Sequence, residues 1–133
     1  MTRSSLMWHG FEAERLEDDA LAVVVIPRLG AKIVSLCDPR RDHDWLVSPT
    51  RPLRTAHPGD SFSDYDLSGW DEMFPTIDAC TFIDSAGRAH ALPDHGEVWA
   101  RAWTTVPTDS ERLTVRTAGK FQRCTLEREI TFE

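Results

Sequence analysis

The sequence has no long apolar run and no cluster of basic residues. Its longest apolar stretch, ALAVVVIP at residues 20–27, is far shorter than the roughly 20 residues that a membrane-spanning helix needs. The N-terminal segment contains a base but no apolar region typical of a secretion signal. The net charge is −7, from 22 acidic and 15 basic residues. We therefore expect a cytoplasmic protein that binds neither nucleic acid nor a membrane.

Cysteine is scarce, and the signatures of nucleophilic catalysis are missing. The three cysteines, Cys37, Cys80 and Cys124, are odd in number and widely spaced. This pattern favours buried, reduced thiols over a disulfide framework or a zinc site. Neither a GxSxG elbow nor a phosphate-binding glycine loop occurs. These absences argue against a serine or cysteine nucleophile and against a nucleotide-binding loop.

A sustained helical period is also missing. Short β-branched and aromatic runs alternate with turn residues along all 133 residues, which is a length that suits a single domain, 1–133. Seven or eight strands joined by turns predict an all-β fold, an antiparallel β-sandwich or a barrel-like sheet. A proline-rich stretch at 48–69 predicts a long loop, and DSAGR at 84–88 predicts a chain reversal. The clearest predicted strands are 8–15, 20–26, 31–36, 45–47, 97–105 and 112–119. A last strand is predicted from Lys120 onward, where Phe121 and every second residue after it would point to one face and Gln122 and every second residue after it to the other.

One segment, LPDHGEVWARAW at 92–103, places His95 between the acids Asp94 and Glu97. Imidazole exchanges a proton near neutral pH, and flanking carboxylates orient its ring, so His95 is the candidate catalytic residue. Two alternatives stay open. His95 could sit in a turn made by Asp94 and Gly96 with no substrate. A metal site with His90 is weaker, because the adjacent His-x-His pair of a cupin-type site is missing, and we expect no metal ion and no cofactor.

Aromatic rings next to acids and arginine suit a sugar, because flat rings bind the apolar face of a pyranose while charged groups bind its hydroxyls. The predicted strand at 97–105 would put Trp99 and Trp103 on one face, although core packing is the commoner role of such tryptophans. Trp70 stands where the long loop re-enters the sheet, followed by two acids that point to opposite faces if extended. The candidate substrate-binding residues are Trp70, Asp71, Glu72, Asp94, Glu97 and Arg101.

Two blocks of the sequence resemble one known family. VVVIPRLGAKIVSLCDPRRDHDWL at 23–46 is similar to the opening of the aldose 1-epimerase (galactose mutarotase-like) proteins, with a P-x-L-G-A turn, an I-x-S-L strand and a DP…WL segment. PDHGEVWARAW at 93–103 is similar to the family segment in which a histidine followed by glycine lies at the sugar site. Together with their order and spacing, the blocks extend the resemblance over residues 20–103.

The resemblance implies a β-supersandwich that binds a small-molecule sugar or sugar derivative in an open cleft and interconverts its α and β anomers. In that family a carboxylate removes the proton of the anomeric hydroxyl while a histidine protonates the ring oxygen, without a cofactor. His95 matches the family's substrate-contacting histidine. The usual N-R pair of the preceding strand is replaced here by GWDEMFPTI at 69–77, so the sugar is left open.

The family's members are longer, and their principal acid histidine and base lie beyond the matched region. The resemblance therefore implies an amino-terminal half, an incomplete sandwich and a homo-oligomer formed through unpaired edge strands. A non-catalytic sugar-binding or interaction module is the alternative function.

Overall fold

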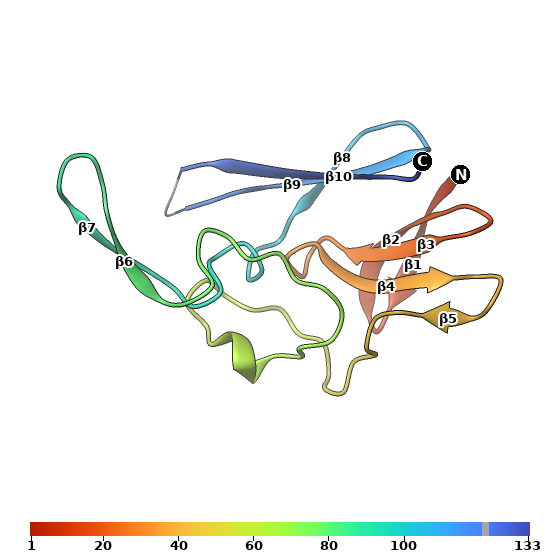
Figure 1. Ribbon diagram of the computed structural model, residues 1–133, viewed down its shortest axis with the longest axis horizontal. Coiled ribbons are helices and arrows are strands. Elements are labelled where there is room, and N and C mark those ends of the chain that lie inside the picture. The colour runs from red at the N-terminus through yellow and green to blue at the C-terminus, as the bar shows by residue number, and fades with distance from the viewer. Residues whose placement is uncertain (121–122) are drawn as a thin grey trace.

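The computed structural model describes residues 1–120 and 123–133 and confirms an all-β fold built from antiparallel sheets (Figure 1). The described residues contain no α-helix, only a short 3-10 turn, η1 (Phe62–Asp64). One sheet has the order β1-β2-β3-β4-β5 and another the order β10-β9-β8, and β6 and β7 form a separate hairpin. The strands are β1 (Thr2–Trp8), β2 (Phe11–Glu17), β3 (Ala22–Ile26), β4 (Lys32–Asp38), β5 (His43–Asp44), β6 (Cys80–Ile83), β7 (Ala89–Leu92), β8 (Thr104–Val106), β9 (Arg112–Ala118) and β10 (Thr125–Thr131).

The five-stranded sheet is centred on the most apolar run of the chain. All five residues of β3, AVVVI, are buried, because β3 lies between β2 and β4 and carries apolar side chains on both faces. Val23 and Val25 belong to one core cluster, and Val24 and Ile26 belong to the other. Strand alternation thus assigns neighbouring valines to opposite faces of the sheet.

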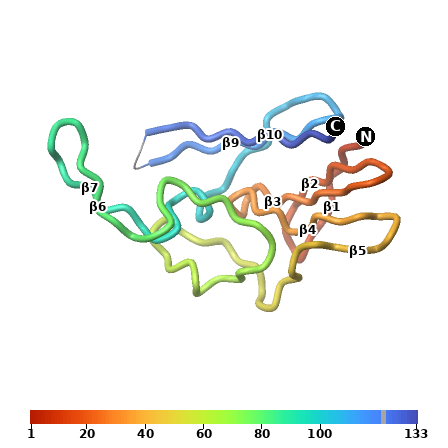
Figure 2. Tube along the Cα trace, viewed as in Figure 1, coloured from red at the N-terminus to blue at the C-terminus, as the bar shows by residue number. Residues whose placement is uncertain are grey.

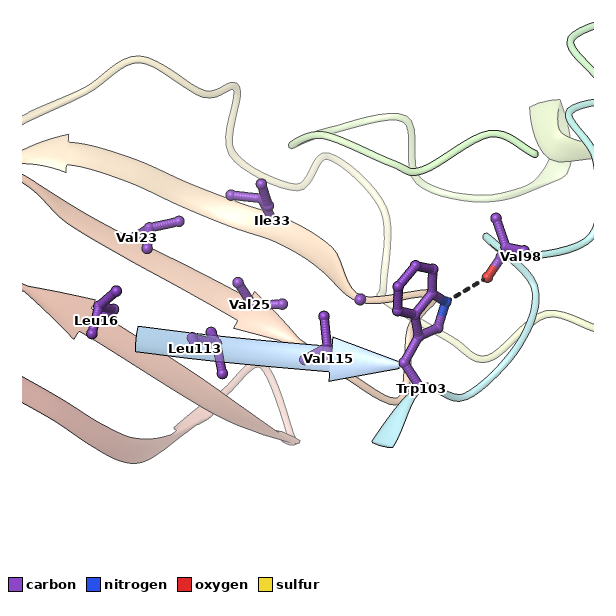
Figure 3. Close-up of a cluster of buried hydrophobic side chains, with 9 residues drawn as sticks. Leu16, Val23, Val25, Ile33, Val98, Trp103, Leu113 and Val115 are labelled. Atoms are coloured by element: carbon purple, nitrogen blue, oxygen red, sulfur yellow. Dashed lines mark hydrogen bonds between the residues drawn. The ribbon is translucent and has the colours of Figure 1, made fainter. Parts of the chain in front are cut away.

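The larger core cluster lies between the five-stranded sheet and β9 (Figure 3). Leu113 and Val115 of β9 face Leu16, Val23 and Val25, and all of these side chains are almost completely buried. Trp103 closes one end of the cluster, where its indole Nε1 donates a hydrogen bond of 3.0 Å to the Val98 carbonyl. Two antiparallel sheets sharing such a layer form a sandwich-like core.

The PRLG turn predicted at 27–30 joins β3 to β4 and is confirmed. Gly30 and Ala31 both have positive φ angles, 67° and 52°. A Cβ on Gly30 would overlap the backbone of Trp99, and the Gly30 amide donates to the Arg101 carbonyl at 3.0 Å. Only glycine can adopt this angle at so close an approach without strain.

The β6–β7 hairpin extends away from the two main sheets, and its tip is the predicted reversal at 84–88 (Figures 1 and 2). The Asp84 carboxylate organises this tip by accepting hydrogen bonds of 2.9 Å from the amides of Ala86 and Arg88 and from His90. Led by the His90 contact, these bonds lower the pKa of Asp84 to about 2.

Several predicted strands are wrong. Residues 97–103 form turns instead of a strand, because the chain reverses at His95 and Gly96, which have positive φ angles of 56° and 70°. Trp99 and Trp103 therefore share no strand face, although both are buried as core packing would require. Residues 45–47, predicted as a strand, form none: β5 ends at Asp44, whose carboxylate accepts the Leu46 amide and bends the chain there.

Other boundaries also differ from the prediction. A single strand predicted at 8–15 is split by a tight turn at His9 and Gly10, which join β1 to β2. The final strand begins at Thr125, and Phe121 and Gln122 lie outside the described residues. The long loop at 48–69 is confirmed, with η1 as its only helical turn in the described chain.

The expectation of buried cysteines is wrong for this chain. Cys80 is exposed on β6, and Cys37 and Cys124 are half-buried. Cys80 is exposed because its hairpin has no sheet packed against it. In residues 1–120 and 123–133, no helix is long and apolar enough to cross a membrane.

We predict that Leu113→Ala lowers the free energy of unfolding by about 2–5 kcal/mol, because it opens a cavity between the sheets. Urea denaturation followed by tryptophan fluorescence measures this loss. Leu67→Ala is the matched control: Leu67 is 58% exposed, and the same substitution there should change stability by less than about 0.5 kcal/mol. Equal effects of the two substitutions would contradict this assignment of the core.

Candidate functional site

A pocket opens beside the PRLG turn, where the long loop crosses the sheet. The pocket is narrow: its cavity volume is about 30 Å³, and about 410 Å³ when the solvent-filled space at its mouth is included. Arg28 and Lys32 contribute from the turn and from β4, and Phe62 and Tyr65 contribute from the long loop. Trp99, Asp66 and Asp71 also line the pocket.

A buried ion pair forms the polar end of this pocket. Lys32 Nζ lies 2.6 Å from Asp71 Oδ2 and 3.1 Å from the Asp66 carbonyl, and the side chains of Lys32 and Asp71 are 5% and 8% exposed. Burial raises the pKa of the Asp71 carboxyl above its ordinary value, and the neighbouring Lys32 ammonium opposes this shift without cancelling it. Asp71 is therefore a stronger base than an exposed aspartate.

The expectation that the two adjacent acids point to opposite faces agrees with the structure. The backbone of Trp70 pairs with Ile33 of β4 through hydrogen bonds of 2.8 and 3.0 Å, which keeps this segment extended. Asp71 then points into the pocket, whereas Glu72 lies 3.4 Å from Arg128 of β10. The Trp70 side chain is 57% exposed and does not line the pocket.

His95 is held beside the pocket by contacts on several sides. Its amide donates to the Ile77 carbonyl at 2.8 Å, and its ring stacks on Phe62 with centroids 4.2 Å apart and an interplanar angle of 11°. His95 Nδ1 lies 2.7 Å from Asp94 Oδ1. Since an ionised carboxylate only accepts, Nδ1 carries the proton in this contact, which leaves Nε2 as the atom able to exchange a proton with a ligand.

The turn expected as the alternative role of His95 is present as well. A Cβ on Gly96 would overlap the backbone of Phe74, and the Glu97 amide donates to the Phe74 carbonyl at 2.8 Å. His95 thus belongs to a tightly fixed turn. The same turn places its imidazole against Phe62 in the pocket wall.

Glu97 and Arg101 are placed away from the pocket. The Glu97 side chain is completely buried, and its carboxylate accepts a hydrogen bond of 2.8 Å from the Lys120 amide. Arg101 Nη1 lies 3.4 Å from the same carboxylate. Glu97 therefore joins the 95–103 turns to the end of β9, and the structure gives it a stabilising role within the fold.

The pocket contains residues that the sequence analysis did not select. Lys32 could have been found, because a lysine within an apolar strand needs a buried counter-ion. No sequence pattern indicated that Phe62 and Tyr65 would line a pocket, because they lie in an irregular loop whose path depends on tertiary contacts. Trp99 also lines the pocket, making edge-to-face contacts with Phe62 and Tyr65 at 5.0 and 5.4 Å.

Within the described part of the chain, no group of three or more His, Cys, Asp or Glu side chains is arranged to hold a metal ion. His90, which the metal alternative required, is instead paired with Asp84 at the hairpin. No protein-family model matches the chain, and no curated protein matches it either. Functional inference therefore depends on the pocket and on the two sequence blocks described above.

We predict that Lys32→Met destabilises the fold by about 3–5 kcal/mol, because it leaves the Asp71 carboxylate buried without its cation. The double variant Lys32→Met, Asp71→Leu should recover much of this loss, since both charges are then gone. Urea denaturation measures both changes. The control Lys120→Met alters an exposed lysine and should have little effect. A Lys32→Met protein as stable as the wild type would contradict the buried-pair assignment.

Proposed function

We propose that this chain is a carbohydrate-binding protein of the aldose 1-epimerase type, which interconverts the α and β anomers of an aldose by acid–base ring opening. The observation that carries the proposal is the position of His95. Its ring stacks on a pocket residue, its Nδ1 is fixed by Asp94, and its Nε2 is left for proton exchange. The resemblance of residues 23–46 and 93–103 to that family supports the same activity.

The proposed reaction uses Asp71, which lines the pocket, and His95, which lies beside it against Phe62. Asp71 removes the proton of the anomeric hydroxyl, for which its raised pKa suits it. His95 Nε2 donates a proton to the ring oxygen, and the bond between the anomeric carbon and that oxygen breaks to give the open-chain aldehyde. Rotation about the bond next to the carbonyl and reclosure on its other face return both protons and yield the other anomer.

Aromatic contact with the sugar ring is assigned to Trp99 and Phe62 in this proposal. Both line the pocket, and a flat aromatic ring suits the apolar face of a pyranose. Because the pocket is narrow, we expect the long loop that carries Phe62 to move outward when the sugar enters. Trp70, which the sequence had favoured, is exposed and is not one of the residues that line the pocket, so it is given no role here.

A non-catalytic sugar-binding module is the second candidate, and one observation favours it. Both carboxylates of the pocket already have partners: Asp71 is bound to Lys32, and Asp66 accepts the amides of Thr50, Arg51 and Ser68. A carboxylate that is already hydrogen-bonded in this way holds the pocket residues in place and is less available to remove a proton from a sugar. Binding of a hexose without anomer exchange would select this second function.

We predict that the wild-type protein accelerates anomer exchange of glucose or galactose, and that His95→Gln slows it by about a hundredfold or more. Exchange spectroscopy by NMR measures the rate. His90→Gln is the matched control, because His90 is also paired with an aspartate but lies on the hairpin. If wild type and His95→Gln exchange anomers equally fast, the catalytic proposal fails.

We also propose that the chain forms a homo-oligomer through an unpaired strand edge. Among the described residues, β10 pairs only with β9, so its other edge carries free backbone donors and acceptors. Leu126, Ile130 and Phe132 on its inner side are only partly buried. Sedimentation over a range of concentrations should show a dimer, and a monomer at the highest concentration would contradict this expectation.

A further inference from the structure

Two arginines stand at a rim that the site pocket shares with a second hollow. Arg28 and Arg54 line the pocket described above, and they also line an adjoining groove over the turn between β1 and β2. Leu53 is the third residue common to both walls. A ligand that occupies the pocket and reaches its mouth therefore meets both guanidinium groups.

Neither of these two arginines forms an ion pair with a carboxylate among the described residues, although Asp60 lies near enough to Arg54 for the charge of Arg54 to lower the pKa of Asp60. Most arginines of this acidic chain pair with Asp or Glu, as Arg3 does with Glu14. In the described residues, by contrast, Arg28 has neither a hydrogen bond nor an ion pair. Arg54 donates to the Asp64 carbonyl at 2.7 Å and lies 4.3 Å above the Tyr65 ring, so it too lacks a carboxylate partner.

The acids nearby already have other partners. Asp60, which interacts electrostatically with Arg54, accepts hydrogen bonds from the Tyr65 hydroxyl and the His57 amide. Asp71 is paired with Lys32, and the Asp66 carboxylate is occupied by backbone amides. Glu12 lines the adjoining groove and forms no ion pair with either arginine. The rim therefore offers two guanidinium groups to an anion, and guanidinium binds carboxylate and phosphate oxygens through paired hydrogen bonds.

A third donor lies unused in the same pocket wall. Trp99 is 6% exposed, and its indole Nε1 is buried without an acceptor in the part of the chain that the structure describes. A buried N–H without a partner costs about 1–3 kcal/mol, so such a group in a pocket wall points to a ligand oxygen. A hydroxyl of a sugar ring is an oxygen of the required kind.

We propose that Arg28 and Arg54 bind the anionic group of an acidic sugar, a carboxylate or a phosphate, whose ring lies in the pocket against Trp99. This inference rests on the proposed function, and it names the substrate class of the same site. The neutral sugar ring would be held by the aromatic residues, and the two arginines would select its charged substituent at the mouth.

The test is an NMR titration of the wild-type protein at low salt with glucose, glucuronate, glucose 6-phosphate and inorganic phosphate. Glucuronate or glucose 6-phosphate should bind about tenfold or more tightly than glucose, which corresponds to about 1.4 kcal/mol. The acid that binds more tightly identifies the group as carboxylate or phosphate. Inorganic phosphate should bind more weakly than glucose 6-phosphate, because it lacks the ring.

Arg28→Gln and Arg54→Gln should each remove most of this preference, so that the ratio of the affinities for the acidic sugar and for glucose falls toward one. Arg54→Lys, which keeps the charge, should retain part of it. Arg88→Gln is the matched control, because it removes the same charge from the exposed tip of the β6–β7 hairpin and should leave the preference intact. Amide spectra of each variant verify that it is folded.

The outcomes separate this inference from the proposed function. If glucose binds and exchanges its anomers but the acidic sugars bind no more tightly, the inference is wrong and the proposed function stands. If inorganic phosphate binds as tightly as glucose 6-phosphate, the ring contributes nothing and the inference is overturned. If no sugar binds, both fall.

Discussion

The buried pair of Lys32 and Asp71 is the constraint on which the site depends. A charge removed from water costs several kcal/mol unless it is paired and hydrogen-bonded, so neither side chain can leave the other cheaply. Lys32 is fixed in β4, between strands of the main sheet. It therefore anchors Asp66 and Asp71, which bracket the end of the long loop, against the sheet. An irregular loop thus gains a fixed end, and the pocket gains a wall with a defined position.

Close backbone contacts set the opposite wall. Gly30 lies against the backbone of Trp99, and Gly96 lies against the backbone of Phe74. The segment from His95 to Trp99 is held between these two contacts, so the imidazole and the indole have little freedom to shift. Such close approaches are open only to glycine, because any side chain would occupy the space of the neighbouring chain. The positions of Trp99 in the pocket wall and of His95 beside it therefore depend on these two glycines.

Sequence patterns predicted the features that depend on local chemistry. The apolar run of β3, the PRLG turn and the reversal at Asp84 were predictable, because β-branched residues, proline, glycine and aspartate act within a few positions. The alternation through Trp99 and Trp103 predicted a strand at 97–105 that is wrong for residues 97–103. The positive φ angles of His95 and Gly96 turn the chain just before that segment. Phe62 could not be predicted as a partner of His95, because the contact joins residues far apart in the sequence and depends on the path of an irregular loop.

The choice between catalysis and simple binding comes down to two opposing effects on Asp71. Burial disfavours its charged form and makes it a better proton acceptor, whereas Lys32 stabilises that charge and makes it a poorer one. Burial is the larger effect, so the pKa is raised despite the ion pair. When Asp71 accepts a proton, Lys32 keeps the Asp66 carbonyl as a partner and is not left without a hydrogen bond. The Lys32 ammonium nevertheless loses its counter-charge in that step, and a buried charge without a counter-ion costs several kcal/mol. This cost opposes proton transfer to Asp71, whereas burial of the carboxylate favours it, and the balance of the two decides between catalysis and simple binding.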